Sequence, residues 1–401
     1  MARAAPLPFT PATAKSRPLG GDASGERPQE GEKGRGARSN VSGRFESEQR
    51  EALSGVWTDA SGEDWGDGWG DGDPRPPALK TSVTEERARV IITRNQSPDV
   101  PFDRSINPYR GCEHGCVYCF ARPTHAFMGL SPGLDFEAKL FAKPNAAALL
   151  ERELSRKSYQ PRVIAFGTNT DPYQPVEARY KLMRSLLKVL DRFNHPVSVL
   201  TKSALIMRDL DILGPMAERG LVKAGLSITT EDRKLARAME PRAATPERRF
   251  QALEALAKAG VPTAVMTAPM IPALNDSEME SLLERAAAAG AEEAGYTLLR
   301  MPLEVAGLFR EWLETFAPER AKRVLSLVRQ THGGRDGDAR WYLRTRGEGA
   351  FADLVRDRFR RACAALKLNA RAYPHRTDLF RPPPRTGADG GGQLSLFGDE
   401  R

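Results

Sequence analysis

The sequence is poor in cysteine and has no long apolar run. No run reaches the roughly 18 apolar residues that a membrane-spanning helix needs. The first residues, Met-Ala-Arg-Ala-Ala-Pro-Leu-Pro, also lack the apolar core of a secretory signal. The 401 residues include only 4 cysteines, which argues against a disulfide framework. We therefore expect a cytoplasmic protein in a reducing compartment.

The cysteines that are present gather in one segment. Cys112, Cys116 and Cys119 lie in residues 106–122, Ile-Asn-Pro-Tyr-Arg-Gly-Cys-Glu-His-Gly-Cys-Val-Tyr-Cys-Phe-Ala-Arg. Side chains of a regular strand alternate between two faces, so three thiols this close need a loop that wraps around a metal. Gly111 and Gly115 allow the backbone to turn there.

Two kinds of metal site fit this loop. One is zinc, with His114 or Cys363 as a fourth ligand, but no second CxxC and no HxxxH pair occurs in the sequence. The other is a cubane iron-sulfur cluster, which tolerates three protein ligands if another molecule fills the fourth site.

The CxxxCxxC spacing, with Tyr118 before the last cysteine, resembles the signature of the radical S-adenosylmethionine (SAM) enzymes. The resemblance implies that Cys112, Cys116 and Cys119 hold three irons of a [4Fe-4S] cluster, while SAM binds the fourth. It also implies that a reductant protein supplies one electron, and that SAM breaks into methionine and a 5'-deoxyadenosyl radical. The cofactors carry this chemistry and the protein positions them.

Helical and strand patterns alternate after the cysteine loop. The expected strands are 105–109, 162–166, 197–200, 222–228, 263–271 and 295–301, and the expected helices are 145–157, 177–193, 206–219, 246–259, 277–289 and 305–328. Such alternation predicts parallel βαβ units. Because six units do not close an eight-stranded barrel, we expect an α/β fold with a partial (β/α)6 barrel, as the family resemblance also implies.

Composition divides the chain into four regions. We expect a mostly disordered N-terminal region (1–85), a radical SAM core (86–304), a basic helical C-terminal extension (305–370) and a flexible tail (371–401). The basic stretch 34–45 is an exception that could lie along the folded domain or along nucleic acid.

Polar residues follow several strands, at the edge where parallel βα folds bind ligands. Thr168, Asn169, Thr170 and Asp171 resemble the place where family members hold the amino group of SAM, although such residues before proline also favour turns. Lys202 is a point charge suited to the carboxylate of SAM. Ser227 is a further candidate, and Tyr118 should pack near the adenine.

Within the superfamily the sequence looks most like the spore photoproduct lyase branch. The corresponding lyase has a cysteine in the loop after the second strand, and that cysteine returns a hydrogen atom to the product. Residues 166–171 here contain none, so no catalytic residue is assigned. Cys363 is the remaining thiol, and the sequence around it favours an inert position in the core. Tyr342 or Tyr373 could serve as hydrogen-atom donors instead.

A basic region and a short motif near residue 395 suggest binding partners. Residues 319–361 contain 12 Lys or Arg and 6 Asp or Glu. Arg340, Arg344 and Arg346 could contact the phosphates of DNA or RNA, although basic helices are also common solvated faces. Near the end, Gln393, Leu394, Leu396 and Phe397 resemble the pentapeptide with which bacterial repair proteins dock on the sliding clamp.

Three hypotheses follow. The leading one is a radical SAM enzyme that acts on nucleic acid, as in DNA repair. The second is radical SAM modification of RNA or protein. The third is a non-enzymatic, metal-stabilised adaptor recruited to the sliding clamp.

Overall fold

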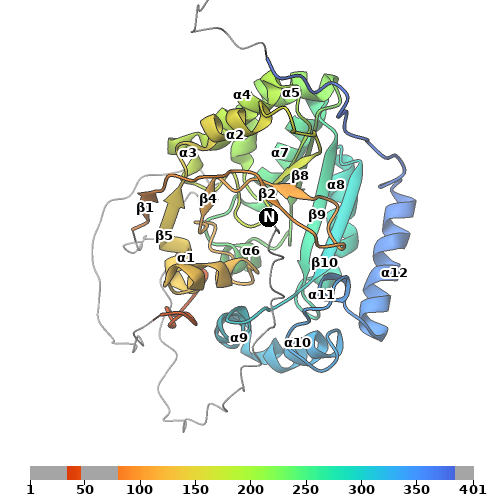
Figure 1. Ribbon diagram of the computed structural model, residues 1–401. Coiled ribbons are helices and arrows are strands. Elements are labelled where there is room, and N and C mark those ends of the chain that lie inside the picture. The colour runs from red at the N-terminus through yellow and green to blue at the C-terminus, as the bar shows by residue number, and fades with distance from the viewer. Residues whose placement is uncertain (1–33, 47–79, 384–401) are drawn as a thin grey trace, which may run out of the picture. The chain divides into compact units, whose positions relative to one another are not determined.

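The computed structural model describes residues 34–46 and 80–383 (Figure 1). All of them belong to one compact unit, residues 31–401. The clamp-like residues 393–397 and most of the region 1–85 lie outside the described residues. No helix in the described ranges is long and apolar enough to span a bilayer.

The main sheet has seven strands in the order β10-β9-β8-β7-β6-β3-β2. Their bounds are β2 Thr93–Arg94, β3 Arg104–Ser105, β6 Ile164–Phe166, β7 Val197–Thr201, β8 Val222–Ser227, β9 Thr263–Met270 and β10 Glu293–Leu298. Neighbours from β3 to β10 are parallel, and only β2 pairs antiparallel. This confirms the predicted sheet of parallel strands.

The first strand differs from its expected range. Instead of one strand at 105–109, the chain forms β3 in the main sheet and β4 (Tyr109–Arg110) in a second sheet, with β1 (Ser82–Glu85) and β5 (Lys139–Ala142). Pro108 lies between the two strands and has no N–H for a ladder bond, which favours the break. The cysteine loop follows β4 directly, so both sheets position it.

Helices connect the parallel strands and cover the sheet (Figure 1). They are α2 Ala146–Leu154, α3 Glu177–Tyr180, α4 Leu182–Arg192, η2 Ala204–Asp209, α5 Leu210–Glu218, α6 Arg233–Met239, α7 Pro246–Lys258, η3 Asp276–Glu278 and α8 Met279–Ala288, while η1 Arg122–Met128 and α1 Leu134–Ala138 follow the cysteine loop. The expected helix 177–193 divides at Lys181, whose φ is 52°. Buried side chains such as Leu187, Leu226 and Leu253 form the core between helices and strands, each contributing about 1.5–3 kcal/mol.

The C-terminal extension packs on this core. Its helices are α9 Val305–Phe316, α10 Pro318–Gln330, α11 Leu343–Arg346 and α12 Ala350–Ala365, and Pro318 ends the single helix expected over 305–328. Phe309 and Trp312 of α9 share a hydrophobic cluster with Val117 and Tyr118 of the cysteine loop. The extension therefore helps to hold that loop.

Residues 371–383, assigned above to the tail, are among the described residues. The N–H of Arg376 donates to the carbonyl of Gly220 at 3.0 Å, and that of Arg381 donates to the carbonyl of Phe193 at 3.0 Å. This segment lies along the core.

Candidate cofactor site at the cysteine loop

The cysteine loop presents three thiols from a tightly turned backbone. Cys112 and Cys116 are buried, Cys119 is partly exposed, and all three are free. Gly111 and Gly115 have φ of 76° and 65°, as expected from the turns that the spacing requires. A Cβ at Gly111 would lie 2.7 Å from Leu140, and one at Gly115 would lie 2.6 Å from Glu137. Both turns therefore require glycine.

The thiols lie close enough to influence one another. Burial raises the pKa of Cys112, and the charges of Asp171, Cys116 and Cys119 raise it further. Burial also raises the pKa of Cys116 and of Cys119. Three thiolates so close together, two of them buried, are thus unfavourable without a cationic partner, which is the situation of a metal-binding loop.

The donor set, three cysteine thiols, matches an iron-sulfur cluster whose fourth iron takes another ligand. No three His, Cys, Asp or Glu side chains in the described ranges converge on one metal ion. In a [4Fe-4S] cluster each cysteine binds a different iron, so such convergence is not required. The proposed fourth zinc ligands are also engaged elsewhere, because His114 Nδ1 lies 3.3 Å from Asp171 and Cys363 packs in the main core.

A buried ion pair holds the loop in place. The Arg122 side chain donates to the carbonyls of Cys116 at 2.9 Å and of Gly115 at 3.0 Å, and it pairs with Glu137. Both side chains are fully buried. Sequence reasoning missed this pair, because neither residue belongs to a recognisable motif.

An N-terminal segment, residues 35–41, covers the loop. The N–H groups of Gly36 and Ala37 donate to the Glu137 carboxylate at 2.9 and 2.7 Å. Gly36 lies so close to the loop that a Cβ there would be 1.7 Å from the carbonyl oxygen of Gly115. Of the two placements expected for the basic stretch 34–45, the one along the folded domain is present.

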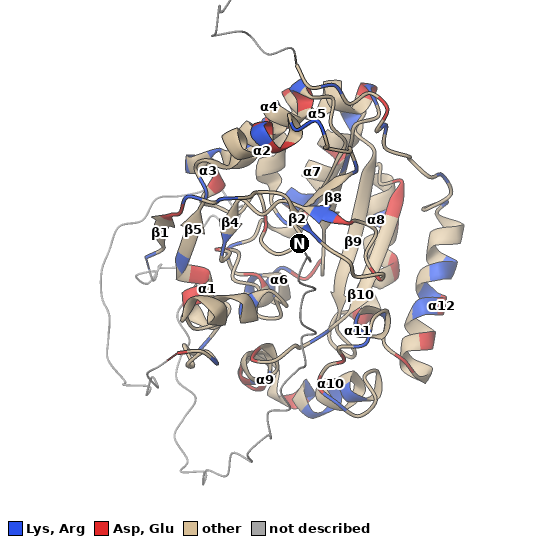
Figure 2. Cartoon of the chain, viewed as in Figure 1, with Lys and Arg blue, Asp and Glu red and all other residues tan. Residues whose placement is uncertain are grey.

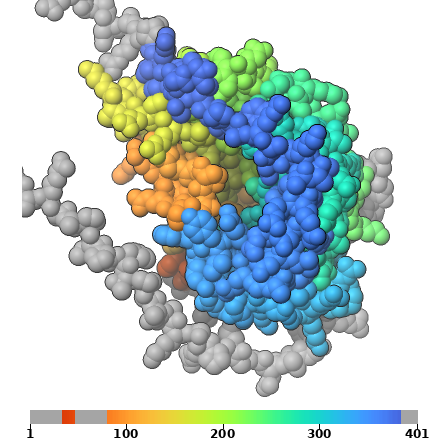
Figure 3. Space-filling view, turned by 90° about the vertical axis from the view of Figure 1, so that its right-hand side faces the viewer, coloured from red at the N-terminus to blue at the C-terminus, as the bar shows by residue number. Residues whose placement is uncertain are grey.

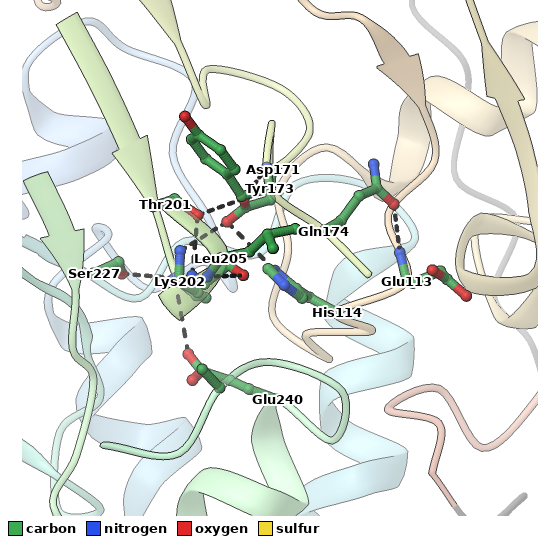
Figure 4. A network of polar contacts seen from close by, with 12 residues as sticks. Glu113, His114, Asp171, Tyr173, Gln174, Thr201, Lys202, Leu205, Ser227 and Glu240 are labelled. Atoms are coloured by element: carbon green, nitrogen blue, oxygen red, sulfur yellow. Dashed lines mark hydrogen bonds and ion pairs between the residues drawn. The ribbon is translucent and has the colours of Figure 1, made fainter. Parts of the chain in front are cut away.

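Lys202 lies at the centre of a polar network at the end of β7 (Figure 4). Its ammonium donates to the Ser227 hydroxyl at 2.6 Å and lies 3.8 Å from Glu240. The same nitrogen is 5.8 Å from the centre of the Tyr118 ring. Three predicted SAM contacts, Tyr118, Lys202 and Ser227, are therefore brought together.

Glu240 is the acidic partner in this network. It is fully buried, accepts from Thr229 Oγ1 at 2.7 Å and from the Tyr118 hydroxyl, and pairs with Arg249. Burial alone would raise the pKa of Glu240, but the charges of Arg249 and Lys202 lower it to about 2. The sequence pattern gave no sign of Glu240 or Arg249.

Asp171 supports the same site from the end of β6. Its carboxylate accepts from Thr201 Oγ1 at 2.6 Å and from the N–H of Lys202 at 2.8 Å. Burial opposes ionisation, yet His114 and these hydrogen bonds lower the pKa of Asp171 to about 2. Asp171 thus fixes the backbone from which the Lys202 side chain extends.

Residues 168–170, which precede Asp171 in the loop after β6, form hydrogen bonds with Asn107 and Tyr109. Asn107 Oδ1 accepts from the N–H groups of Asn169 and Thr170 at 3.2 and 3.3 Å, and its amide donates to Thr168 at 3.3 Å. The Thr170 hydroxyl donates to the carbonyl of Tyr109. These contacts are those of a structured turn, and a role of residues 168–170 in SAM binding stays a prediction.

Comparisons with known proteins identify the family of the chain. The radical SAM superfamily model matches residues 106–286. An uncharacterized protein of Mycobacterium tuberculosis is 40% identical over 233 residues, which are 58% of this chain and 68% of that protein. The chain belongs to the radical SAM superfamily. Membership in the superfamily implies a [4Fe-4S] cluster and SAM as cofactors.

Similar proteins extend to archaea and to solved structures. An uncharacterized protein of Methanocaldococcus jannaschii is 28% identical over 200 residues, or 50% of this chain and 71% of that protein. A spore photoproduct lyase complexed with dinucleoside spore photoproduct has a TM-score of 0.50 at 15% identity, covering 71% of this chain and 79% of that one. A variant of that lyase with bound AdoMet also has a TM-score of 0.50. At this identity the similarity shows a shared fold.

The arginines expected to contact nucleic acid already have protein partners. Arg340 pairs with Asp338 at 2.6 Å and with Glu348 at 2.7 Å. The Arg344 Nε donates to Asp99 at 2.6 Å. Arg346 lies over the Tyr342 ring at 5.8 Å. Lys and Arg also line α10 and α12 (Figure 2).

Proposed function

We propose that the chain is a radical SAM enzyme that holds a [4Fe-4S] cluster on Cys112, Cys116 and Cys119 and acts on nucleic acid. The observation that carries the proposal is the position of Lys202 and Tyr118 at a glycine-turned loop with three free thiols, of which Cys112 and Cys116 are buried. When bound, the cluster and SAM supply a one-electron cleavage that yields a 5'-deoxyadenosyl radical.

The side chains around Lys202 bind and orient SAM. The Lys202 ammonium binds the carboxylate of SAM as a point charge, with Ser227 as a neighbouring polar contact. Glu240 accepts a hydrogen bond from the Tyr118 hydroxyl and so fixes the ring against which the adenine packs. Asp171 anchors the Lys202 backbone, which keeps this arrangement preorganised.

We also infer that the six parallel strands curve into a partial barrel that opens to the substrate. Two observations support this curvature: the fold similarity to the lyase and a hollow between the orange residues near position 100 and the blue C-terminal helices (Figure 3). The cysteine loop and the ends of β6, β7 and β8 meet in the network around Lys202.

The substrate proposal rests on similarity and charge. The lyase of similar fold is complexed with dinucleoside spore photoproduct, and residues 319–361 of this chain are basic. The loop after β6 has no thiol for the hydrogen-returning step of the lyase. Residues 166–171 lack a cysteine, and burial raises the pKa of Cys363 to about 11 in a core position.

Anaerobic reconstitution tests the enzyme class. The protein reconstituted with iron and sulfide, then reduced with dithionite in the presence of SAM, should release 5'-deoxyadenosine. If no 5'-deoxyadenosine forms and zinc alone supports folding, the chain is a metal-stabilised adaptor instead.

We further propose that the pentapeptide at 393–397, which lies outside the described residues, docks on a bacterial sliding clamp. A short apolar motif can place a few side chains in a pocket of a partner. A purified clamp should retain the wild-type chain and lose a Leu396→Ala, Phe397→Ala variant. Equal retention of both would rule out this docking.

A further inference from the structure

Arg300 lacks an acidic partner at the edge of the sheet where ligands bind. It lies just after β10 and is partly buried. In the ranges 34–46 and 80–383, no carboxylate pairs with it, whereas the nearby Arg344 is paired with Asp99. Its guanidinium instead lies over the Phe120 ring, 4.9 Å from the centre. The aromatic contact leaves most of its hydrogen-bond donors for a ligand.

Burial leaves the charge of Arg300 poorly solvated. Burial lowers the pKa of Arg300, and the neighbouring positive charge of Arg344 lowers it further. The opposing influences come from Asp99, which Arg344 already binds, and from Cys119 of the cysteine loop. An incoming anion would replace the solvation that the Arg300 guanidinium loses on burial.

The surroundings also offer aromatic surface. Phe120 directly follows Cys119 and is 47% exposed. Trp341 is 57% exposed and Tyr342 is 46% exposed, on the segment that leads to Arg344. An arginine over an exposed aromatic ring, as Arg300 lies over Phe120, is a common arrangement for a phosphate and an unstacked base.

We propose that Arg300 binds a phosphate of a single-stranded nucleic acid substrate and that Phe120 stacks on the adjacent base, next to Cys119. This inference rests on the proposed function and specifies its substrate site. It assigns direct substrate contact to two residues outside the segment 340–346, whose Arg340 and Arg344 are already paired with carboxylates. The arrangement favours a base that has left the helical stack, because a stacked base exposes no face to the Phe120 ring.

The experiment measures binding of fluorescein-labelled oligothymidylate and oligouridylate to the holoprotein by fluorescence polarisation. Affinity is measured between about 50 and 200 mM salt, since each phosphate contact with a single strand adds about 0.7 to the slope of log K against log salt. The variants are Arg300→Gln and Arg300→Lys. The control is Arg179→Gln, because Arg179 also lies over an aromatic ring, Tyr180, but at α3.

The expected result is specific to Arg300. Arg300→Gln should weaken binding by about tenfold or more and reduce the salt slope by about 0.7. Arg300→Lys should keep the slope but lose part of the affinity, because lysine lacks the planar fork. Arg179→Gln should match the wild type. A preference for one oligonucleotide identifies the substrate as DNA or RNA.

Three outcomes would overturn the proposal. They are an Arg300→Gln variant that binds with wild-type affinity and slope, equal effects of Arg300→Gln and Arg179→Gln, and absence of salt-dependent binding by the wild type. Thermal unfolding of each variant checks that a loss of binding is not a loss of folding. Failure of the proposed function is a separate result, namely no 5'-deoxyadenosine from the reconstituted wild type.

Discussion

At the scale of single residues, the site depends on charges that are buried and matched. The Glu240 carboxylate lies between the cations of Lys202 and Arg249. Arg122 and Glu137 form a separate ion pair. Only Lys202 was expected from the sequence, because a lysine at a strand end is visible there. Pairs between distant positions leave no local pattern, so Glu240, Arg249 and Glu137 could not be predicted.

Replacing Lys202 with methionine should weaken SAM binding by roughly 10- to 150-fold. This is the range for losing a charge-assisted hydrogen bond of about 1.5–3 kcal/mol, and the apolar stem is kept. Isothermal titration calorimetry with SAM measures the change. Lys258→Met is a suitable control, since Lys258 is exposed and pairs with Glu254. Equal affinities for the Lys202 variant and the wild type would remove Lys202 from the SAM site.

Replacing Glu240 with glutamine should lower the free energy of unfolding by about 3–5 kcal/mol. The change leaves the buried Arg249 guanidinium without its counter-charge. Urea denaturation measures the loss, with Glu254→Gln as an exposed control whose stability should change little. A Glu240→Gln variant as stable as the control would show that the pair contributes little.

At the scale of elements, segments distant in the sequence hold the loop and the sheet. Residues 35–41 cover the cysteine loop, α9 packs behind it, and residues 375–381 lie along β7 and the end of α4. The alternation of strands and helices was predictable from periodicity. The sequence also offered the placement of 34–45 along the folded domain, but the contacts that hold residues 35–41 and 375–381 join distant positions and leave no local pattern.

Gly36→Ala tests the segment that covers the loop. The added Cβ would overlap the carbonyl oxygen of Gly115, so the segment should detach and Glu137 should lose two hydrogen bonds. We expect a loss of about 2–3 kcal/mol of unfolding free energy. Gly307→Ala in α9, with no atoms within 4 Å of its Cβ, should instead be neutral or slightly stabilising. Similar stabilities of the two variants would contradict the covering role.

His195, which lies beside Phe380 of the C-terminal segment, makes the stability of the fold depend on pH. Burial lowers its pKa from 6.5 to about 4, while Nε2 contacts the Tyr159 hydroxyl at 2.7 Å. The unfolded chain therefore binds the proton more readily. The contribution of neutral His195 is complete above pH 6.5 and is lost as pH falls toward 4, by about 3 kcal/mol in total.

Chemical denaturation between pH 7 and pH 4 measures this loss. A His195→Gln variant should lose about 3 kcal/mol less than the wild type over that range. Parallel pH profiles for the two proteins would contradict the assignment.

At the scale of the whole molecule, the fold brings together groups that the sequence keeps apart. The spacing of cysteines predicted the loop, and periodicity predicted the parallel sheet. The turn from β3 to β4, the buried ion pairs and the unpaired Arg300 depend on tertiary contacts, which no short pattern specifies. The central claim remains chemical: three cysteines of the loop, and not the fourth, bind the cluster.

Comparison of Cys119→Ala with Cys363→Ala tests that claim most directly. Both changes remove one sulfur, but only Cys119 belongs to the loop, while Cys363 packs in the main core. After anaerobic reconstitution, the wild type and Cys363→Ala should each hold about four irons per chain and release 5'-deoxyadenosine, whereas Cys119→Ala should do neither. A Cys119→Ala protein that keeps its iron and its 5'-deoxyadenosine production would contradict the account.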